Sequence, residues 1–322
     1  MEALDITKLV LGVLGIALIT KGADWFTNAS VNIASATKIP RVIIGATIVS
    51  MATTLPEFTA STVSTLQGSK FAVPNAIGST VCNIGLILGS CVLIRAMAIP
   101  NRVIAFKQGI FMLCCGAVAT LFAYNGTFAW WEGAILFAGV PLYLIFSIRL
   151  ARGKHQHAIE DATNSNDEIF SIRWRREISF FLLGAGSVVL GSKFLVDSAV
   201  NIAEVLNVPQ HVIGILLVAV GTSLPEYATA LMATIKGYQE LSVGNVIGAN
   251  ILDIVWVIGV NAMIKEQVMP PQAQVLDFPF MLILMVGLIV FGWTKSRLSR
   301  WEGGAIFLIY LIYLGIIFTK FI

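Results

Sequence analysis

Residues 22–61 read GADWFTNASVNIASATKIPRVIIGATIVSMATTLPEFTAS, and residues 191–230 read GSKFLVDSAVNIAEVLNVPQHVIGILLVAVGTSLPEYATA. The two stretches match at a constant offset of 169 residues, through Asn32 with Asn201, Pro40 with Pro209, Gly45 with Gly214, and Leu55-Pro56-Glu57 with Leu224-Pro225-Glu226. Further along, the offset becomes 170, and Trp131-Glu132-Gly133 matches Trp301-Glu302-Gly303. The repeat covers nearly the whole chain outside a central segment, and it therefore predicts two similar halves.

The composition predicts a membrane protein. Hydrophobic residues make up 57% of the 322-residue chain and charged residues only 12%, whereas a soluble domain carries about 25% charged residues. The mean hydropathy of +0.85 agrees with this class. Because a spanning helix needs about 20 mostly apolar residues, we expect ten spans, at about residues 6–27, 39–66, 71–95, 103–123, 128–150, 177–199, 208–235, 240–263, 273–293 and 302–321.

Five spans in each half have a geometric consequence. An odd number reverses the second copy, so that the two halves cross the membrane in opposite directions, as in many secondary transporters. The predicted fold class is an all-α membrane protein with ten transmembrane helices in two inverted five-helix repeats. The expected division is a first repeat at 1–150, a polar linker at 151–176 whose composition cannot form a core, and a second repeat at 177–322.

The basic residues predict the orientation, because Lys and Arg gather in cytoplasmic loops. Four lie on one side: Lys8, Lys70, Lys265 and Lys320. Fifteen lie on the other: Lys38, Arg41, Arg95, Arg102, Lys107, Arg149, Arg152, Lys154, Arg173, Arg175, Arg176, Lys236, Lys295, Arg297 and Arg300. We therefore expect a multi-pass protein of the plasma (cell inner) membrane, with a cytoplasmic linker and both termini outside. The sequence contains no long basic stripe, so nucleic-acid binding is not predicted.

Glu57 and Glu226 occupy matched positions near the middle of their predicted spans. A charged side chain there costs about 2.5–3.5 kcal/mol or more. One such residue could be a protonated carboxyl that is hydrogen-bonded in the core, but a symmetric pair among polar neighbours favours a functional site. Pro56 and Pro225 each remove a helical hydrogen bond, so we expect a broken helix beside each glutamate.

The residues around these glutamates offer oxygen ligands. They are Ser50, Thr53, Thr54, Thr222 and Ser223 in the same segments, and Asn75, Ser79, Asn83, Asn245, Asn250 and Asp253 in the flanking ones. Calcium takes 6–8 oxygens, including carboxylates and backbone carbonyls. The cysteines, by contrast, lie in apolar runs without metal-binding spacing. The pattern therefore predicts a site for a hard cation.

The motif pairs TTLPE with GTSLPE, and NAIGSTVCNIG with NVIGANILDI, resemble the two alpha-repeats of the sodium/calcium exchangers, of the prokaryotic type, within the cation/calcium antiporter superfamily. The resemblance implies ten helices, four central cation sites and alternating access. It implies that Glu57 and Glu226 bind Ca²⁺ with backbone oxygens of Thr53 and Thr222. It assigns Na⁺ to sites with Ser50, Thr54, Ser79, Ala219, Ser223 and Glu226, and places Asn83 and Asp253 beside the central site.

The sequence departs from the family pattern at four positions. Ala52 replaces a glycine, Thr54 replaces a serine, and Ser50 stands where alanine is common. Ala249 replaces a serine that would match Ser79. This last change removes a hydroxyl from one expected sodium site, so the number of Na⁺ ions carried per cycle stays open.

Taken together, these features predict a secondary antiporter that exchanges Ca²⁺ for Na⁺ and is not an enzyme. It is expected to need no cofactor, to have Ca²⁺, Na⁺ and the lipid bilayer as partners, and to act as a monomer. Exchange of Ca²⁺ for protons, or exchange that also requires potassium, would use the same carboxylates. A calcium channel would instead pass the ion downhill without a counter-ion. An intramembrane aspartyl protease also needs two acidic residues, but no catalytic motif is present.

Overall fold

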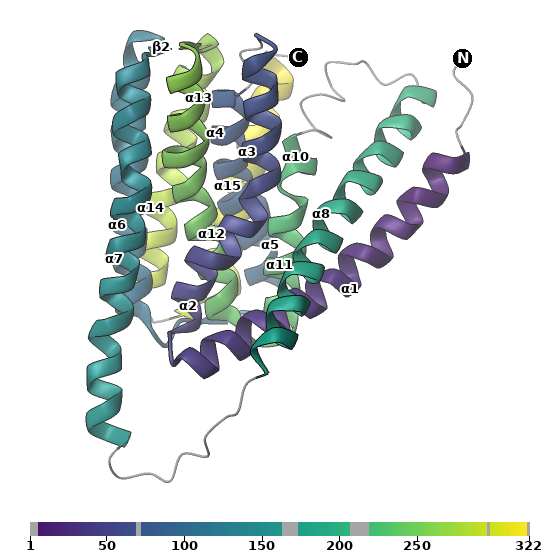
Figure 1. Ribbon diagram of the computed structural model, residues 1–322. Coiled ribbons are helices and arrows are strands. Elements are labelled where there is room, and N and C mark those ends of the chain that lie inside the picture. The colour runs from purple at the N-terminus through teal and green to yellow at the C-terminus, as the bar shows by residue number, and fades with distance from the viewer. Residues whose placement is uncertain (1–5, 69–71, 163–172, 207–218, 295–296, 321–322) are drawn as a thin grey trace.

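The computed structural model describes residues 6–68, 72–162, 173–206, 219–294 and 297–320, and these are almost entirely helical (Figure 1). Within these residues, nine segments are long and apolar enough to cross a membrane. A helix suits this role because it satisfies every backbone N–H and C=O within its own segment, where lipid offers no hydrogen-bond partner.

The elements follow in two runs along the chain. The first run is α1 (Ile6–Thr37), α2 (Arg41–Ile44), η1 (Gly45–Val49), α3 (Ser50–Leu66), α4 (Ala72–Cys82), η2 (Asn83–Leu88), α5 (Gly89–Ile94), β1 (Met97–Ala98), α6 (Arg102–Phe122), η3 (Ala123–Asn125), β2 (Thr127–Phe128) and α7 (Trp130–Ala162). The second is α8 (Trp174–Val205), α10 (Ala219–Thr222), α11 (Leu224–Ile235), α12 (Gln239–Leu252), η5 (Asp253–Ile258), α13 (Gly259–Ile264), β3 (Gln267–Val268), η6 (Ala273–Asp277), α14 (Phe278–Thr294), β4 (Arg297–Leu298) and α15 (Arg300–Lys320).

Nine of the predicted spans correspond to these helices, although several boundaries differ. The remaining span, 208–235, begins in residues 207–218, which lie outside the described part of the chain; α10 and α11 form its later portion. Helix α1 is longer than predicted and ends at Thr37. Helix α7 continues to Ala162 and α8 begins at Trp174, so both helices extend into the segment 151–176.

Three of the segments that carry predicted site residues are the most buried of the nine spans. The segments 41–66, 72–94 and 239–264 have larger buried shares than the other six spans. Small residues allow this close packing. On α12, a Cβ atom at Gly244 would overlap the carbonyl of Val42, and one at Gly248 would overlap the carbonyl of Ala46. Helix α12 therefore lies directly against the backbone of α2 and η1.

Several structural features recur at the 170-residue offset. The π-helical turns η2 and η5 begin at Asn83 and Asp253. Each two-stranded ribbon joins one strand from each half, because β1 pairs with β4 and β2 pairs with β3. Gly89 packs on Phe307, and in the same way Gly259 packs on Phe137. Each half thus uses equivalent residues to contact the other.

The expectation of a broken helix at both prolines is wrong for the first half. Helix α3 continues from Ser50 to Leu66 with Pro56 inside it, and the irregular turn η1 precedes it. In the second half, the helix is interrupted at Ser223 (φ −89°, ψ 5°), between α10 and α11. Pro225 lies in the first turn of α11, where a backbone N–H has no helical partner to lose.

Helices α1 and α8 form a separate pair at one side of the bundle. Gly15 and Gly22 of α1 pack against Gly191 and Gly184 of α8. The two helices run in opposite directions and lean away from the other helices toward the upper right of the view (Figure 1). The Lys236 ammonium, directly after α11, contacts Asp24 of α1 and so ties the pair to α11.

Candidate cation site

Glu57 on α3 and Glu226 on α11 are both fully buried, each with a side-chain exposure of 0%. Both therefore point into the protein and not into lipid. The Ser223 hydroxyl, at the interruption between α10 and α11, donates a hydrogen bond of 2.8 Å to Glu57 Oε1. The side chains that face the Glu226 carboxylate include Thr53 and Thr54. Each glutamate therefore faces hydroxyl residues of the other half.

A second group of buried polar side chains joins η2 to α12 and η5. Asn83 Nδ2 donates to Asn250 Oδ1 at 3.1 Å and to Asp253 Oδ2 at 3.4 Å. All three side chains are fully buried. The Glu57 carboxylate faces Asp253 and Ser79, so this group borders the glutamates.

Asn245 links the two groups. Thr53 Oγ1 lies 3.3 Å from Asn245 Oδ1 and 3.2 Å from the backbone oxygen of Ser50, and its one proton can be donated to either. Asn245 Nδ2 lies 3.5 Å from the backbone oxygen of Glu226. Asn245 and Asn250 were predicted only as flanking oxygen ligands, and in the structure they are hydrogen-bonded to the predicted site residues Thr53 and Asn83.

Several buried oxygens of this region have no hydrogen-bond partner within the described residues. They are Thr54 Oγ1, Glu57 Oε2, Ser79 Oγ, Asn83 Oδ1, both carboxylate oxygens of Glu226, and Asp253 Oδ1. Leaving a buried polar group unpaired costs about 1–3 kcal/mol, and more for a charged one. All of these atoms are oxygens, which are the ligands that Ca²⁺ and other hard cations take. The donor chemistry therefore fits a hard cation.

The acidic residues are too few at any one point to bind a metal alone. Among the residues that the structure describes, no three His, Cys, Asp or Glu side chains converge closely enough to hold a metal ion. A cation here would take most of its ligands from hydroxyl, amide and backbone oxygens. This arrangement differs from a resident metal centre, in which carboxylate, imidazole or thiolate side chains dominate.

The remaining predicted ligands lie on α10 and α3. Ser50 is fully buried at the start of α3. Ala219 is the first residue of α10, but its side chain lies outside the described part of the structure. Thr222 ends α10 and lines a cavity of about 290 Å³ together with Pro56 and Pro225.

This cavity extends from the site toward α8. Its wall on that side includes Ser192, Lys193 and Asp197. Neither Asp197 nor Ser192 was among the residues predicted for the site. The repeat could have indicated Asp197, because it matches Asn28 at the 169-residue offset and both are polar residues within an apolar span.

Cys82 is a further residue whose place was not predicted. It directly precedes Asn83, is buried, and contacts Tyr310 of α15. Its sulfur lies within electrostatic reach of both glutamates. Cys82 is therefore a small buried residue beside the predicted site residues.

Comparisons with known proteins agree on one family. The family model described as "Sodium/calcium exchanger protein" matches residues 7–149 and 177–319. The chain is 31% identical over 287 residues to the inner membrane protein YrbG of Escherichia coli, and the match covers 88% of each. It is 26% identical over 339 residues to the sodium/calcium exchanger MaX1 of Methanosarcina acetivorans, covering 95% of this chain and 97% of that one.

The fold is also similar to a solved structure. The sodium-calcium exchanger NCX_Mj, in a crystal soaked with Na⁺ and Sr²⁺, superposes with a TM-score of 0.83 at 28% sequence identity. The alignment covers 96% of this chain and 98% of that one. The similarity therefore extends over the whole arrangement of helices.

Proposed function

Because this chain belongs to the sodium/calcium exchanger protein family, whose members are membrane transporters, we propose that it exchanges Ca²⁺ for Na⁺ through a central site built on Glu57 and Glu226. One observation carries this proposal. Two fully buried glutamates from matched positions lie among unpartnered oxygens, and Ser223 of one half is hydrogen-bonded to Glu57 of the other.

The proposed ligands divide between the two ions. Ca²⁺ takes the carboxylates of Glu57 and Glu226, together with backbone oxygens of Thr53 and Thr222. Na⁺ takes sites formed by Ser50, Thr54, Ser79, Ala219, Ser223 and Glu226, while Asn83 and Asp253 border the centre. The unpartnered oxygens of Thr54, Ser79 and Glu226 support this division.

The proposed architecture is ten transmembrane helices in two inverted repeats, 1–150 and 177–322, joined by the linker 151–176. The contacts that recur at the 170-residue offset support it, as does the twofold match of the family model. The course of the helices also supports it, because α1 descends in the view whereas α8 rises (Figure 1).

The charge of the site explains why transport would be coupled. With both glutamates ionised, the site alone carries about two negative charges, and moving them past an apolar barrier would cost on the order of several kcal/mol per charge. One Ca²⁺ or two Na⁺ balance this charge, and three Na⁺ would leave the site with one positive charge. The loaded forms can switch between the two sides, whereas the unloaded form is held back. Alternating access then yields exchange and not a leak.

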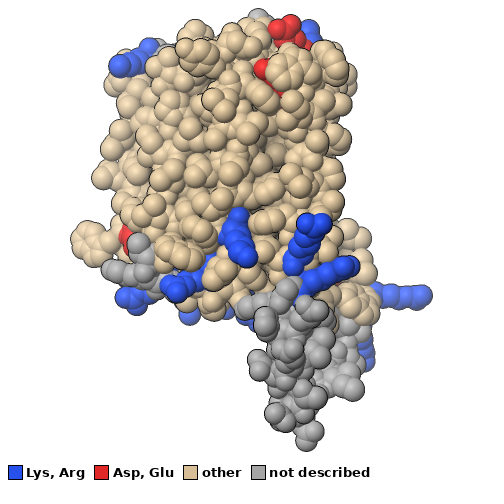
Figure 2. All heavy atoms as spheres, turned by 90° about the vertical axis from the view of Figure 1, so that its left-hand side faces the viewer, with Lys and Arg blue, Asp and Glu red and all other residues tan. Residues whose placement is uncertain are grey.

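The proposed orientation places the linker and the basic loops in the cytoplasm and both termini outside. Lys and Arg gather at the lower end of the molecule, and few lie at the upper end in this view (Figure 2). Basic residues flank the cytoplasmic ends of membrane helices. The inner membrane is the proposed location, in line with the name of the Escherichia coli relative.

A flux assay tests the function. Proteoliposomes loaded with Na⁺ and diluted into Na⁺-free buffer should take up calcium-45, and a Glu57→Ala, Glu226→Ala double variant should not. Uptake by the wild-type protein no greater than that of the double variant would falsify the proposal. Ca²⁺ flux driven by a pH jump without Na⁺ would point to proton exchange. A requirement for K⁺ would point to potassium-dependent exchange. Downhill Ca²⁺ flux without any counter-ion would point to a channel.

A further inference from the structure

A groove of about 590 Å³ lies between α6 and α7, away from the cation site. Its lining combines apolar and basic side chains, namely Phe106, Lys107, Ile110, Phe146, Arg149 and Leu150. Lys107 and Arg149 are both exposed. Within the described residues, neither has a carboxylate within salt-bridge distance. The groove is therefore an apolar trough with two uncompensated positive charges at its rim.

In the orientation proposed above, the two basic residues lie near the cytoplasmic ends of their spans. Arg149 is 19 residues beyond Trp130, the first residue of α7, and this corresponds to about 28 Å along the helix axis. The hydrocarbon layer is about 30 Å thick. Lys107 is five residues after Arg102, the start of α6, or about 8 Å into that span. Figure 2 shows this side of the molecule, with Lys and Arg above its lower end.

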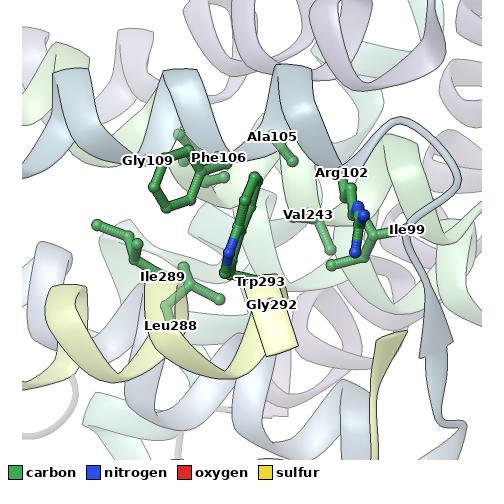
Figure 3. Close-up of a pocket in the computed structure, with 11 residues that line it drawn as sticks. Ile99, Arg102, Ala105, Phe106, Gly109, Val243, Leu288, Ile289, Gly292 and Trp293 are labelled. Carbon is green, nitrogen blue, oxygen red and sulfur yellow. The ribbon is translucent and has the colours of Figure 1, made fainter. Parts of the chain in front are cut away.

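Phe106 forms a rigid wall of the groove, because the side of its ring that faces away from the groove packs against Trp293. The Trp293 ring lies 4.2 Å from the Phe106 ring, and the Arg102 guanidinium lies 5.3 Å from the Trp293 ring (Figure 3). The small cavity around these residues has about 20 Å³ of free volume. That space holds about one water molecule, so a lipid fits only on the α7 side.

We propose that this groove binds an anionic phospholipid of the cytoplasmic leaflet. Its phosphate would lie between the Lys107 ammonium and the Arg149 guanidinium, and an acyl chain would lie along Phe106, Ile110 and Phe146. Basic pockets between membrane helices on the cytoplasmic side suit anionic headgroups. An apolar trough beside the phosphate position favours a lipid over a free phosphate, which has no chain to bury.

Native mass spectrometry of the purified full chain tests this proposal without any ion flux. Dioleoylphosphatidylglycerol should remain bound to the wild-type protein, whereas dioleoylphosphatidylcholine should not. The Lys107→Gln, Arg149→Gln double variant should lose about tenfold or more of the bound phosphatidylglycerol. The matched control is Arg173→Gln, Arg175→Gln, which removes two exposed charges near the start of α8 and should bind as the wild type does.

Further arms separate the possible outcomes. Glycerol phosphate, which carries the headgroup charge without acyl chains, should not displace the lipid; displacement would overturn the proposal in favour of a simple anion site. Equal retention by both double variants would also overturn it. The lipid should raise the melting temperature of the wild type and of the control but not that of the Lys107→Gln, Arg149→Gln variant. Because no Na⁺ or Ca²⁺ is needed, these results are independent of the proposed exchange.

Discussion

Ser223 shows at the residue scale how one side chain can serve both the fold and the site. Its backbone conformation interrupts the helix between α10 and α11, and its hydroxyl donates to Glu57 Oε1 at 2.8 Å. A hydroxyl that donates its proton keeps two lone pairs that can accept. The same oxygen can therefore position a carboxylate and remain available to a cation.

Replacement of Ser223 by alanine tests this double role. A hydrogen bond to a charged group contributes about 1.5–3 kcal/mol, and the variant also loses a proposed Na⁺ ligand. The Na⁺ concentration for half-maximal Ca²⁺ exchange should therefore rise about tenfold. The measurement is Ca²⁺ release from proteoliposomes over a series of Na⁺ concentrations.

The matched control is Ser30→Ala. Ser30 is also fully buried, but its hydroxyl donates to the Phe26 backbone oxygen of its own helix at 2.7 Å. The Na⁺ dependence of this variant should equal that of the wild type. If Ser223→Ala behaved like the control, Ser223 would have no part in Na⁺ binding.

At the scale of elements, the packing of α12 against α2 and η1 decides where the site residues lie. Gly244 and Gly248 are four residues apart on one face of α12, and both meet backbone carbonyls of the first half. This close approach brings Asn245 within hydrogen-bond distance of Thr53. At the equivalent glycine in the first half, Gly78, an added Cβ would meet no neighbouring atom within 4 Å. The halves are therefore similar in sequence but differ in local packing.

This difference predicts opposite effects for equivalent substitutions. Gly248→Ala should destabilise the protein by about 1–3 kcal/mol, because a Cβ would overlap Ala46 and Ser50 and overpacking costs that much. Gly78→Ala should be neutral or stabilising by up to about 1 kcal/mol, since alanine is the better helix former. The check is the melting temperature of each variant in detergent. Equal shifts for the two would show that the close contact at Gly248 is unimportant.

The two prolines give a second contrast between equivalent positions. Pro56 lies inside α3, where it removes a helical hydrogen bond at a cost of up to about 3 kcal/mol. Pro225 lies in the first turn of α11 and removes none. Pro56→Ala should therefore raise the melting temperature clearly, whereas Pro225→Ala should change it little. A larger gain from Pro225→Ala would contradict this account of the helix interruption.

At the scale of the whole molecule, the net charge moved per cycle follows from how many Na⁺ ions replace one Ca²⁺. Ala249 supplies no hydroxyl at the position that matches Ser79 of the first half. The second half therefore has one hydroxyl fewer with which to bind Na⁺, and this bears on how many Na⁺ ions are carried. Three Na⁺ leaving for each Ca²⁺ entering would move one positive charge outward. Two Na⁺ would move none.

A voltage experiment distinguishes these cases. One charge across 100 mV corresponds to about 2.3 kcal/mol. With three Na⁺ per Ca²⁺, an inside-positive potassium diffusion potential should increase Na⁺-driven Ca²⁺ uptake into proteoliposomes, and an inside-negative one should decrease it. With two Na⁺, uptake should not respond to voltage. Calcium-45 uptake at several K⁺ gradients with valinomycin measures the response.

The sequence alone was enough to predict the class of the molecule, most of its spans, the repeat and the paired glutamates. These features are local or periodic: apolar runs of sufficient length form helices in lipid whatever their neighbours, and Glu57 matches Glu226 by simple alignment. The family resemblance rests on the same short motifs and is confirmed by the family match.

Tertiary structure alone decided which side chains meet. That Ser223 bonds to Glu57, that Asn83 bonds to both Asn250 and Asp253, and that Pro56 stays within a continuous helix depends on how the helices pack. In lipid this packing is set by close contacts at small residues, not by hydrophobicity. Such contacts join positions far apart in the chain, and no periodic pattern along the sequence records them.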